Sequence, residues 1–497
     1  MQFQYAKDSA SVKADVLVLP VFEENNPLHA YSFGAKLAAL LASKDDVKGK
    51  AGELTLLPSN GVVSASRVAI LGLGKKDKAG AQQFGEALAG FFRGGSINTY
   101  KLKHVAVALE AVSGLKKTDG ESLGRWAAEG VLLGSYHFDR LFTKKDKKKE
   151  TASKVTLAGG DEGALKKGVA YGEVTAEYTA HCRDLVNEPS NRINPATLAK
   201  FAQDMARKVP GLKCTILHKP EIEKLKMGAF LGVNAGSDIP AHLIVLEWKG
   251  GGAKEAPIAY VGKGLCFDSG GYDIKPAAGM LGMKMDMGGG AATIAALGAI
   301  GKLKLKINAV GVVPATENLI NGSAFHPGSV LTSMSGQTIE IGNTDAEGRL
   351  ILCDALTYTQ KKFKPRVIVD MATLTGAQVV ALGNKVTGVM SNDDKVADAI
   401  ADSFKAVGEE VWRLPLPDFY DKQLDSTIAD MQNIGGNPGT VTAALFLQRF
   451  IDKDQKWAHL DIAGPCMNDA DGWRLWSAKS ATGTPVRPLV EFAENYK

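Results

Sequence analysis

Short apolar runs rich in valine and isoleucine alternate with segments of helical periodicity along most of the chain. Strands that alternate with helices are typical of α/β folds, in which helices cover a central sheet. The first part of the chain predicts strands at 16–20, 67–72, 104–109 and 154–157, and helices at 29–41, 79–92, 121–136 and 168–185. This order predicts a smaller N-terminal α/β domain, followed by a long connecting helix.

The alternation resumes after a helix-start signal in which Asn194 precedes Pro195. Further strands are expected at 214–217, 243–247, 258–261, 308–313 and 367–370, and further helices at 289–303, 348–361, 395–407 and 440–450. Such a pattern predicts a mostly parallel sheet flanked by helices on both faces. A chain of 497 residues is too long for one ordinary core. We therefore expect two domains, at 1–165 and 186–497, joined by a helix at 166–185.

Composition narrows the classes of protein to which the chain can belong. The net charge of +5 is small for this length, so neither nucleic acid nor a membrane is required as a partner. The five cysteines are scattered and form no CxxC pair, which favours a reducing compartment, the cytoplasm. The first residues lack the features of a signal peptide. The most apolar helical segment, 288–300, is shorter than the ~20 residues of a membrane span.

Four acidic residues stand close to glycines in the stretch that runs from 261 to 350. Asp268 lies in FDSGG and Asp286 in KMDMGGG, and NTDAEGRL contains both Asp345 and Glu347. Each acid alone is compatible with a helix cap or a turn. Four carboxylates gathered between buried strands would repel one another, and an unpaired buried charge is costly. Together, the four acids predict a metal cluster.

Two lysines and one arginine lie among these acids. Lys263 lies in Gly262–Lys263–Gly264, which directly follows the expected strand at 258–261, and ligands of open α/β sheets bind at the carboxyl ends of strands. It can form a salt bridge or, as a neutral amine, bind a metal, because nearby cations depress the pKa of a lysine. Lys275 and Arg349 can balance the charge of the acids, stabilise an oxyanion or hold an anionic base. Residue type alone leaves these alternatives open.

The types of side chain in the stretch indicate which metals it can bind. The sequence has no HExxH motif, and of its eight histidines only His326 lies near the acids, which excludes a zincin. Oxygen-rich ligation with one amine suits Mn²⁺, Mg²⁺, Co²⁺ or Zn²⁺ in a paired site. A water between two such ions would have its pKa lowered towards about 7. The stretch therefore predicts a two-metal hydrolytic site.

At these residues the chain closely resembles the leucyl (cytosol) aminopeptidases, a family of metallopeptidases. NTDAEGRL at 343–350 looks like the signature octapeptide of that family without a change. The motifs GKG-x-x-FDSGG-x-x-IKP at 262–276 and MKMDMGG at 283–289 match at the family's spacing. DLVNEP from Asp184 and HLDIAG at 459–464 extend the likeness over the second domain. The first domain resembles the family only in its α/β pattern.

The resemblance implies a catalytic di-metal peptidase domain at 186–497. Asp268 and Glu347 would bridge two divalent ions per subunit, manganese or zinc, with cobalt or magnesium as alternatives. Asp345 would complete one metal site. Lys263 and Asp286 would complete the other.

The resemblance also implies how the remaining residues act. Lys275 would polarise the scissile carbonyl and hold the gem-diolate oxygen. Arg349 would hold a bicarbonate that carries the proton from water to the leaving amine. The walls of the side-chain pocket would be Met283, Thr373, Gly376 and Ala463. The free α-amine of the substrate would bind one metal, so that a cytoplasmic homohexamer would release N-terminal residues, preferably leucine, from peptides.

A DNA-binding or regulatory protein on the same fold is the main alternative. Lysines of the basic run TKKDKKKE at 143–150 would then contact phosphates, although a solvated loop is the simpler interpretation. A two-metal phosphatase is a third interpretation, but the sequence shows no obvious phosphate clamp and a lysine ligand would be unusual. The complete set of polar residues, which a binding protein has no physical need to keep, favours the aminopeptidase.

Overall fold

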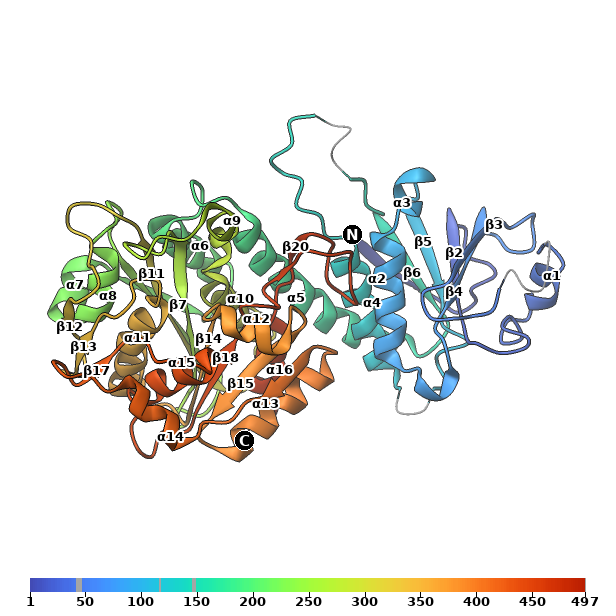
Figure 1. Ribbon diagram of the computed structural model, residues 1–497. Helices are drawn as coiled ribbons and strands as arrows, with labels where there is room; N and C mark the ends of the chain where they lie inside the picture. The colour runs from blue at the N-terminus through green and yellow to red at the C-terminus, as the bar shows by residue number, and fades with distance from the viewer. Residues whose placement is uncertain (42–46, 116–117, 145–148, 497) are drawn as a thin grey trace. The chain divides into compact units, whose positions relative to one another are not determined.

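The computed structural model describes residues 1–41, 47–115, 118–144 and 149–496. Part of the basic run at 143–150, namely 145–148, therefore lies outside the described residues. The chain divides into two units (Figure 1). Unit 1 consists of Met1–Glu177 and Asp469–Lys479, and unit 2 consists of Tyr178–Asn468 and Ser480–Lys497. Among the described residues, no helix is both long enough and apolar enough to cross a membrane.

Unit 1 is built on a six-stranded sheet with the strand order β1-β6-β5-β2-β4-β3. Its strands are β1 (Gln2–Ala6), β2 (Val16–Val21), β3 (Leu54–Pro58), β4 (Arg67–Gly72), β5 (His104–Ala108) and β6 (Lys154–Ala158). Neighbouring strands are parallel except β3 and β4 at one edge. The helices are α1 (Gly34–Ala38), α2 (Ala81–Arg93), α3 (Ser96–Thr99), α4 (Gly120–Gly134) and the first part of α5 (Glu162–Asn187).

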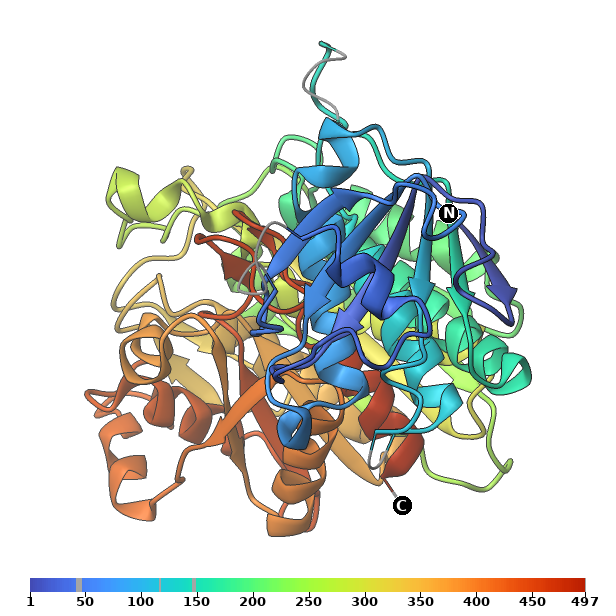
Figure 2. The ribbon, with the colours of Figure 1, turned by 90° about the vertical axis from the view of Figure 1, so that its right-hand side faces the viewer.

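Burial on both faces explains why the strands of unit 1 are almost continuously apolar. Alternate residues of a strand point to opposite faces of its sheet. Val16 and Val18 of β2 pack in one core with Phe84 of α2, whereas Leu17 of the same strand packs in another core with Tyr31. Helices α2 and α4 lie side by side (Figure 1), and the strands of the sheet, in blue and teal, run side by side in Figure 2.

The helix expected at 29–41 is wrong in its extent, because α1 is only five residues long. The residues before it form turns, in which the backbone N–H of His29 donates to the Asn26 carbonyl oxygen. The Tyr31 hydroxyl donates to the Pro20 carbonyl oxygen, which ties this segment to the end of β2. A tertiary contact therefore overrides the helix propensity of the alanines and leucines here.

Unit 2 is built on a nine-stranded sheet with the order β16-β15-β18-β14-β9-β11-β8-β7, in which β10 also pairs with β11. The strands are β7 (Lys213–Leu217), β8 (His242–Lys249), β9 (Ile258–Gly262), β10 (Gly264–Asp268), β11 (Asn308–Asn318), β14 (Val367–Ala372), β15 (Val386–Ser391), β16 (Glu410–Arg413) and β18 (Trp457–Asp461). The central strands β18, β14, β9, β11 and β10 are parallel. The structure thus agrees with the expected mostly parallel sheet.

Helices cover both faces of this sheet. The helices of unit 2 are the end of α5 with α6 (Pro195–Arg207), α7 (Lys219–Lys224), α8 (Gly228–Asn234), α9 (Ala277–Met280), α10 (Gly288–Lys302), α11 (Gly348–Phe363), α12 (Gly376–Leu382), α13 (Asp394–Ala406), α14 (Asp418–Asp421), α15 (Gly439–Gln448) and α16 (Val486–Asn495). Ala259 and Val261 of β9 pack in the core that contains α8, α11 and α15. Tyr260 between them donates its hydroxyl to Leu489 of α16, which contacts α10 and α13.

Two small sheets complete unit 2. One contains β12 (Val330–Thr332), β13 (Thr338–Glu340) and β17 (Met431–Gln432), and the other contains β19 (Met467–Asn468) and β20 (Ser480–Ala481). The parallel pair of β13 and β17 joins segments that lie far apart in the sequence. It brings the residues after β17 next to the loop that precedes α11.

Candidate metal centre

The carboxyl ends of β10 and β11 place the first polar residues of the site. Asp268 ends β10 and is in register with Asn318, which ends β11. The Asn318 side chain donates from Nδ2 to Asp268 Oδ1 (2.9 Å), which also accepts the backbone N–H of Gly270 (2.8 Å). Gly270 has a φ of +88°, in the region that favours glycine. The chain therefore turns sharply around one oxygen of Asp268 and leaves the other, Oδ2, to a cation.

A close approach of α10 to β9 brings Asp286 to Lys263. A Cβ atom on Gly262 would lie 2.3 Å from the Gly289 carbonyl oxygen, and one on Gly289 would lie 2.0 Å from the Met371 carbonyl oxygen. Neither contact is possible with a side chain at these positions. Asp286 lies two residues before α10 and Lys263 directly follows β9, so this packing makes their side chains meet.

The buried ammonium group of Lys263 lies between two carboxylates. Its Nζ is 2.8 Å from Asp286 Oδ2 and 2.8 Å from Glu347 Oε1. It also donates to the Thr373 carbonyl oxygen (3.2 Å). The Thr373 hydroxyl in turn donates to Asp286 Oδ1 (2.6 Å). Thr373 thereby fixes both members of the Lys263–Asp286 pair.

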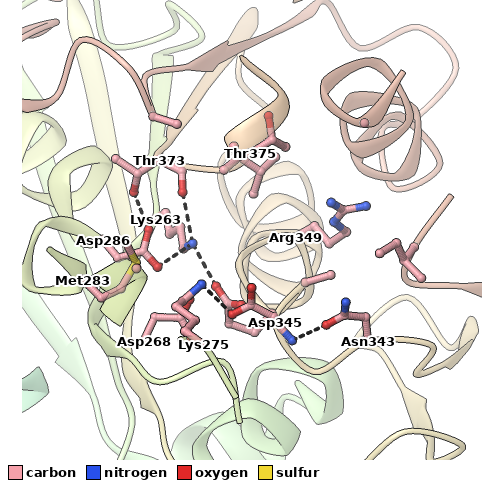
Figure 3. Close-up of a pocket in the computed structure, with 18 of the residues that line it drawn as sticks. Lys263, Asp268, Lys275, Met283, Asp286, Asn343, Asp345, Arg349, Thr373 and Thr375 are labelled. Carbon is pink, nitrogen blue, oxygen red and sulfur yellow. Dashed lines mark hydrogen bonds and ion pairs between the residues drawn. The ribbon is translucent and has the colours of Figure 1, made fainter. Parts of the chain in front are cut away.

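Lys275 forms a second bridge between carboxylates. Its Nζ lies 2.9 Å from Asp268 Oδ2 and 2.5 Å from Asp345 Oδ1. Figure 3 shows the ammonium groups of Lys263 and Lys275 pointing in among the acidic side chains. The structure thus brings together the four acids and both lysines that the sequence singled out.

The turn that carries Asp345 and Glu347 is held by polar contacts. The backbone N–H of Thr344 donates to Asp273 Oδ2 (2.7 Å), and the backbone N–H of Asp345 donates to Asn343 Oδ1 (2.7 Å). Helix α11 begins directly after Glu347. The start of this helix carries a partial positive charge, which favours carboxylates beside it.

Arg349 lies in the first turn of α11 and is buried. Its Nη1 donates to the Asn433 carbonyl oxygen (3.0 Å), while its Nε has no hydrogen-bond partner within the described part of the chain. Burial lowers the pKa of Arg349 to about 10. Figure 3 shows the guanidinium group to one side of the two lysines. A buried guanidinium with an unused donor suits a small anion.

Burial and mutual repulsion raise the pKa values of Asp286, Asp345 and Glu347. Burial, with the charge of Asp268, raises the pKa of Glu347 to about 8. Burial also raises the pKa of Asp286 to about 6, and burial and Asp268 together raise that of Asp345. Burial alone would lower the pKa of Lys263, but the charges of Asp286 and Glu347 outweigh it and raise that pKa. An additional cation would stabilise the ionised acids.

The donor atoms of the cluster fit divalent metal ions. One oxygen atom from each of Asp268, Asp286 and Glu347 lies within 4.8 Å of the other two. Glu347 Oε2 is buried and has no hydrogen-bond partner among the residues described. Carboxylate oxygens are ligands that Mn²⁺ and Mg²⁺ prefer and that Zn²⁺ accepts. A bound cation would satisfy this oxygen.

Every residue predicted for the site lines one cavity of ≈ 540 Å³. These residues are Lys263, Asp268, Lys275, Met283, Asp286, Asp345, Glu347, Arg349, Thr373, Gly376 and Ala463. Sequence reasoning missed the apolar lining residues Leu374, Val379 and Ile434. Their side chains give no signal in the sequence that separates them from core residues.

Sequence reasoning also missed three buried polar residues that support the site. Asn318 contacts Asp268, and Asn433 contacts Arg349. Asp461 accepts the Thr375 hydroxyl (2.7 Å) and the backbone N–H of Leu374 (3.2 Å). It fixes the loop after β14, and its place in the HLDIAG motif is a signal that could have identified it. The two asparagines lie in no such motif.

Comparison with known proteins identifies the family. A profile described as the cytosol aminopeptidase family, catalytic domain, matches residues 180–490, which is more than half of the chain. The chain belongs to the cytosol aminopeptidase family. The N-terminal domain of the same family matches residues 18–145. Membership in the cytosol aminopeptidase family makes this chain a metal-dependent aminopeptidase, a hydrolase that acts on peptides, and decides against the phosphatase hypothesis.

Similarity to cytosol aminopeptidases extends over the whole chain. A probable cytosol aminopeptidase of Chlorobaculum tepidum is 42% identical over 510 residues, which cover 99% of both chains. One from Chloroherpeton thalassium is 39% identical over 506 residues, which cover 98% of both chains. These matches confirm the resemblance that the motifs indicated, and they include unit 1, where the sequence offered only an α/β pattern.

Solved structures confirm the two-domain α/β fold. A variant of tomato leucine aminopeptidase matches with a TM-score of 0.86 and 34% identity, over 99% of this chain and 96% of that one. The bottromycin maturation enzyme BotP in complex with Mn matches with a TM-score of 0.85 and 30% identity, over 97% of this chain and 99% of that one. Divalent metal binding by this chain agrees with both the family and the carboxylate cluster.

Proposed function

We propose that this aminopeptidase releases N-terminal residues from peptides, leucine by preference, with two divalent ions per subunit. The observation that carries the proposal is the cluster of four carboxylates and two lysines in one cavity, at the carboxyl ends of parallel strands. The ions, when bound, supply a water that ionises near neutral pH. Manganese is the first candidate, and zinc, cobalt and magnesium suit the same ligands.

Five residues are proposed to hold the ions. Asp268 and Glu347 are the proposed bridging ligands, which agrees with their burial and with the unused oxygen of Glu347. Asp345 completes one metal site. Lys263 and Asp286, whose side chains meet at 2.8 Å, complete the other. Lys263 would act as a neutral amine, which requires the ions to displace its proton.

The remaining polar residues of the cavity are proposed to act on the substrate. Lys275 lies beside Asp268 and Asp345 and would hold the scissile carbonyl oxygen by its positive charge. Arg349, with its unused Nε donor, would hold a bicarbonate that moves a proton to the leaving amine.

The side-chain pocket supports a preference for leucine. Its proposed walls are Met283, Thr373, Gly376 and Ala463, and apolar residues such as Ile434 line the same cavity. A mostly apolar wall favours a branched aliphatic side chain, because about 25 cal/mol is gained per Å² of apolar surface buried. We also propose that residues 186–497 form the catalytic domain and that the enzyme is a cytoplasmic homohexamer.

The test compares free and blocked substrates. With Mn²⁺ present, the enzyme is expected to hydrolyse leucine amide and leucyl anilides, and to leave their N-acetylated forms intact, because acetylation removes the amine that would bind a metal. Release of p-nitroaniline from leucyl p-nitroanilide measures the rate. Equal turnover of the acetylated compound would contradict the proposed role of the free amine.

A further inference from the structure

Asn433 is a buried asparagine that holds the turn before α11. It directly follows β17, about 90 residues along the chain from that turn. Its Oδ1 accepts the backbone N–H groups of Gly342 (2.8 Å) and Asn343 (3.2 Å). Its Nδ2 donates to the carbonyl oxygens of Asn343 (2.6 Å) and Ala346 (3.2 Å). Both donor hydrogens and both acceptor positions of the side-chain amide are therefore used.

The backbone of Asn433 also contacts Arg349, the next functional residue along the chain. Its carbonyl oxygen accepts Nη1 of Arg349 (3.0 Å), and its N–H donates to the Glu340 carbonyl oxygen of β13 (2.9 Å). The strand pairing of β13 and β17 thus fixes Asn433, and Asn433 fixes both the turn and the guanidinium group of Arg349.

The hydrogen bonds of Asn433 matter for the site because the turn that they hold carries Asp345 and Glu347. Ala346, whose carbonyl oxygen accepts from Asn433, lies between Asp345 and Glu347. A shift of its peptide group would move both carboxylates away from their lysine partners. Glu347 lies 2.8 Å from Lys263, and Asp345 lies 2.5 Å from Lys275. Buried hydrogen bonds in a region of low dielectric constant hold such a geometry strongly. Asn433 contacts neither of the two carboxylates itself.

We propose that Asn433 is a positioning residue for the aminopeptidase reaction, which holds Asp345, Glu347 and Arg349 in one fixed geometry. The proposal rests on the function proposed above. Outer partners of metal ligands typically change metal affinity or activity by about 10–100-fold when they are removed. A purely structural residue would instead lower stability and leave metal affinity unchanged.

The chain provides a matched control in Asn308, at the opposite end of β11 from Asn318. Its Nδ2 donates to the carbonyl oxygens of Gly252 (2.7 Å) and Glu255 (2.9 Å), and its Oδ1 accepts the N–H of Gly251 (3.1 Å). Asn308 therefore holds a loop by the same kind of bonds as Asn433, but it does not line the cavity.

The experiment compares Asn433→Ala and Asn433→Asp with Asn308→Ala and Asn308→Asp. Isothermal titration of the chelated proteins with Mn²⁺ measures the dissociation constant, and hydrolysis of leucyl p-nitroanilide measures kcat and KM. Both Asn433 variants are expected to bind Mn²⁺ about 10–100-fold more weakly. Their kcat should fall, while their KM should stay near that of the wild type. The Asn308 variants are expected to lower the Tm and to keep the Mn²⁺ affinity of the wild type.

Wild-type Mn²⁺ affinity and kcat in both Asn433 variants would overturn the positioning role, and so would equal losses of affinity in the Asn308 variants. If the Asn433 variants fail to fold, amide hydrogen exchange in the wild-type protein tests the positioning role instead. The amides of Gly342 and Asn343 are then expected to exchange slowly, and rapid exchange would overturn the proposal. A wild type that binds Mn²⁺ but does not cleave leucyl p-nitroanilide would contradict the proposed function, while the Mn²⁺ comparison would still test Asn433.

Discussion

Lys263 and Lys275 each lie between two carboxylates that would otherwise repel one another. This arrangement explains why a buried cluster of acids is compatible with a stable fold, since unpaired buried charges are costly. Asp268 is held at both of its oxygens, because Oδ1 accepts two hydrogen bonds and Oδ2 pairs with Lys275.

We predict that Asp268→Asn removes activity and leaves the protein folded. The substitution keeps the shape of the side chain but removes the charge that a bridging ligand needs. Because loss of outer partners already costs about 10–100-fold, loss of a ligand should cost at least about 100-fold in kcat/KM. Hydrolysis of leucyl p-nitroanilide, with circular dichroism to confirm folding, checks this result.

Asp354→Asn is the matched control for this variant. Asp354 is also buried and accepts the backbone N–H groups of Phe230 (2.9 Å) and Met334 (2.7 Å), but it does not line the cavity. Its variant is expected to change stability and to keep activity. Substantial activity in Asp268→Asn would refute the bridging role.

At the scale of elements, the close packing of α10 on β9 and β14 depends on Gly262 and Gly289. We predict that Gly289→Ala destabilises unit 2, because its Cβ atom would lie 2.0 Å from the Met371 carbonyl oxygen, which is backbone and cannot rotate away. Overpacking of this kind costs about 1–3 kcal/mol. Unfolding in urea, followed by circular dichroism, measures the change.

The control is Gly282→Ala, because no atom lies within 4 Å of a Cβ atom built there and the backbone has an ordinary right-handed conformation. This variant should unfold at the urea concentration of the wild type. Equal stability of the Gly289 and Gly282 variants would show that α10 can move away from the sheet without loss.

The sequence predicts β9 and α10 well, but it does not predict the neighbouring strand β10 or the asparagines that support the site. The apolar strand at 258–261 and the helix at 289–303 differ from β9 and α10 by at most one residue at each end. The strand β10 was missed, because its residues, GLCFD, begin with glycine and end at a polar site. Asn318 and Asn433 were missed because an asparagine gives no sign in the sequence of a partner that lies 50 or 90 residues away.

At the scale of the whole molecule, metal binding and protonation compete for the same oxygens. Burial raises the pKa of Asp286 from 3.8 to about 6 and that of Glu347 from 4.5 to about 8. Without metal, and at pH values between the ordinary and the raised pKa of each group, these groups bind more protons in the folded protein than in the unfolded chain. Their contribution to stability therefore falls as the pH rises through them. Metal ions reverse this trend, because they bind the ionised carboxylates.

We predict that Mn²⁺ raises the Tm more at about pH 8 than at about pH 6. Chelation should also abolish activity, and saturation to about 100 times the dissociation constant should add about 2.7 kcal/mol of stability. Differential scanning calorimetry at the two pH values, with Mn²⁺ or with a chelator, measures both shifts. Equal shifts at the two pH values would show that proton release does not accompany metal binding.

Unit 1 is discontinuous in the sequence, since residues 469–479 belong to it although the chain before and after them belongs to unit 2. Arg93 of α2 donates from Nη1 to the carbonyl oxygens of Arg474 (3.0 Å) and Trp476 (2.9 Å) within this insertion. A fragment that ended at Glu177 would lack both acceptors of that guanidinium group. Production of unit 1 alone therefore requires residues 469–479 as well as residues 1–177.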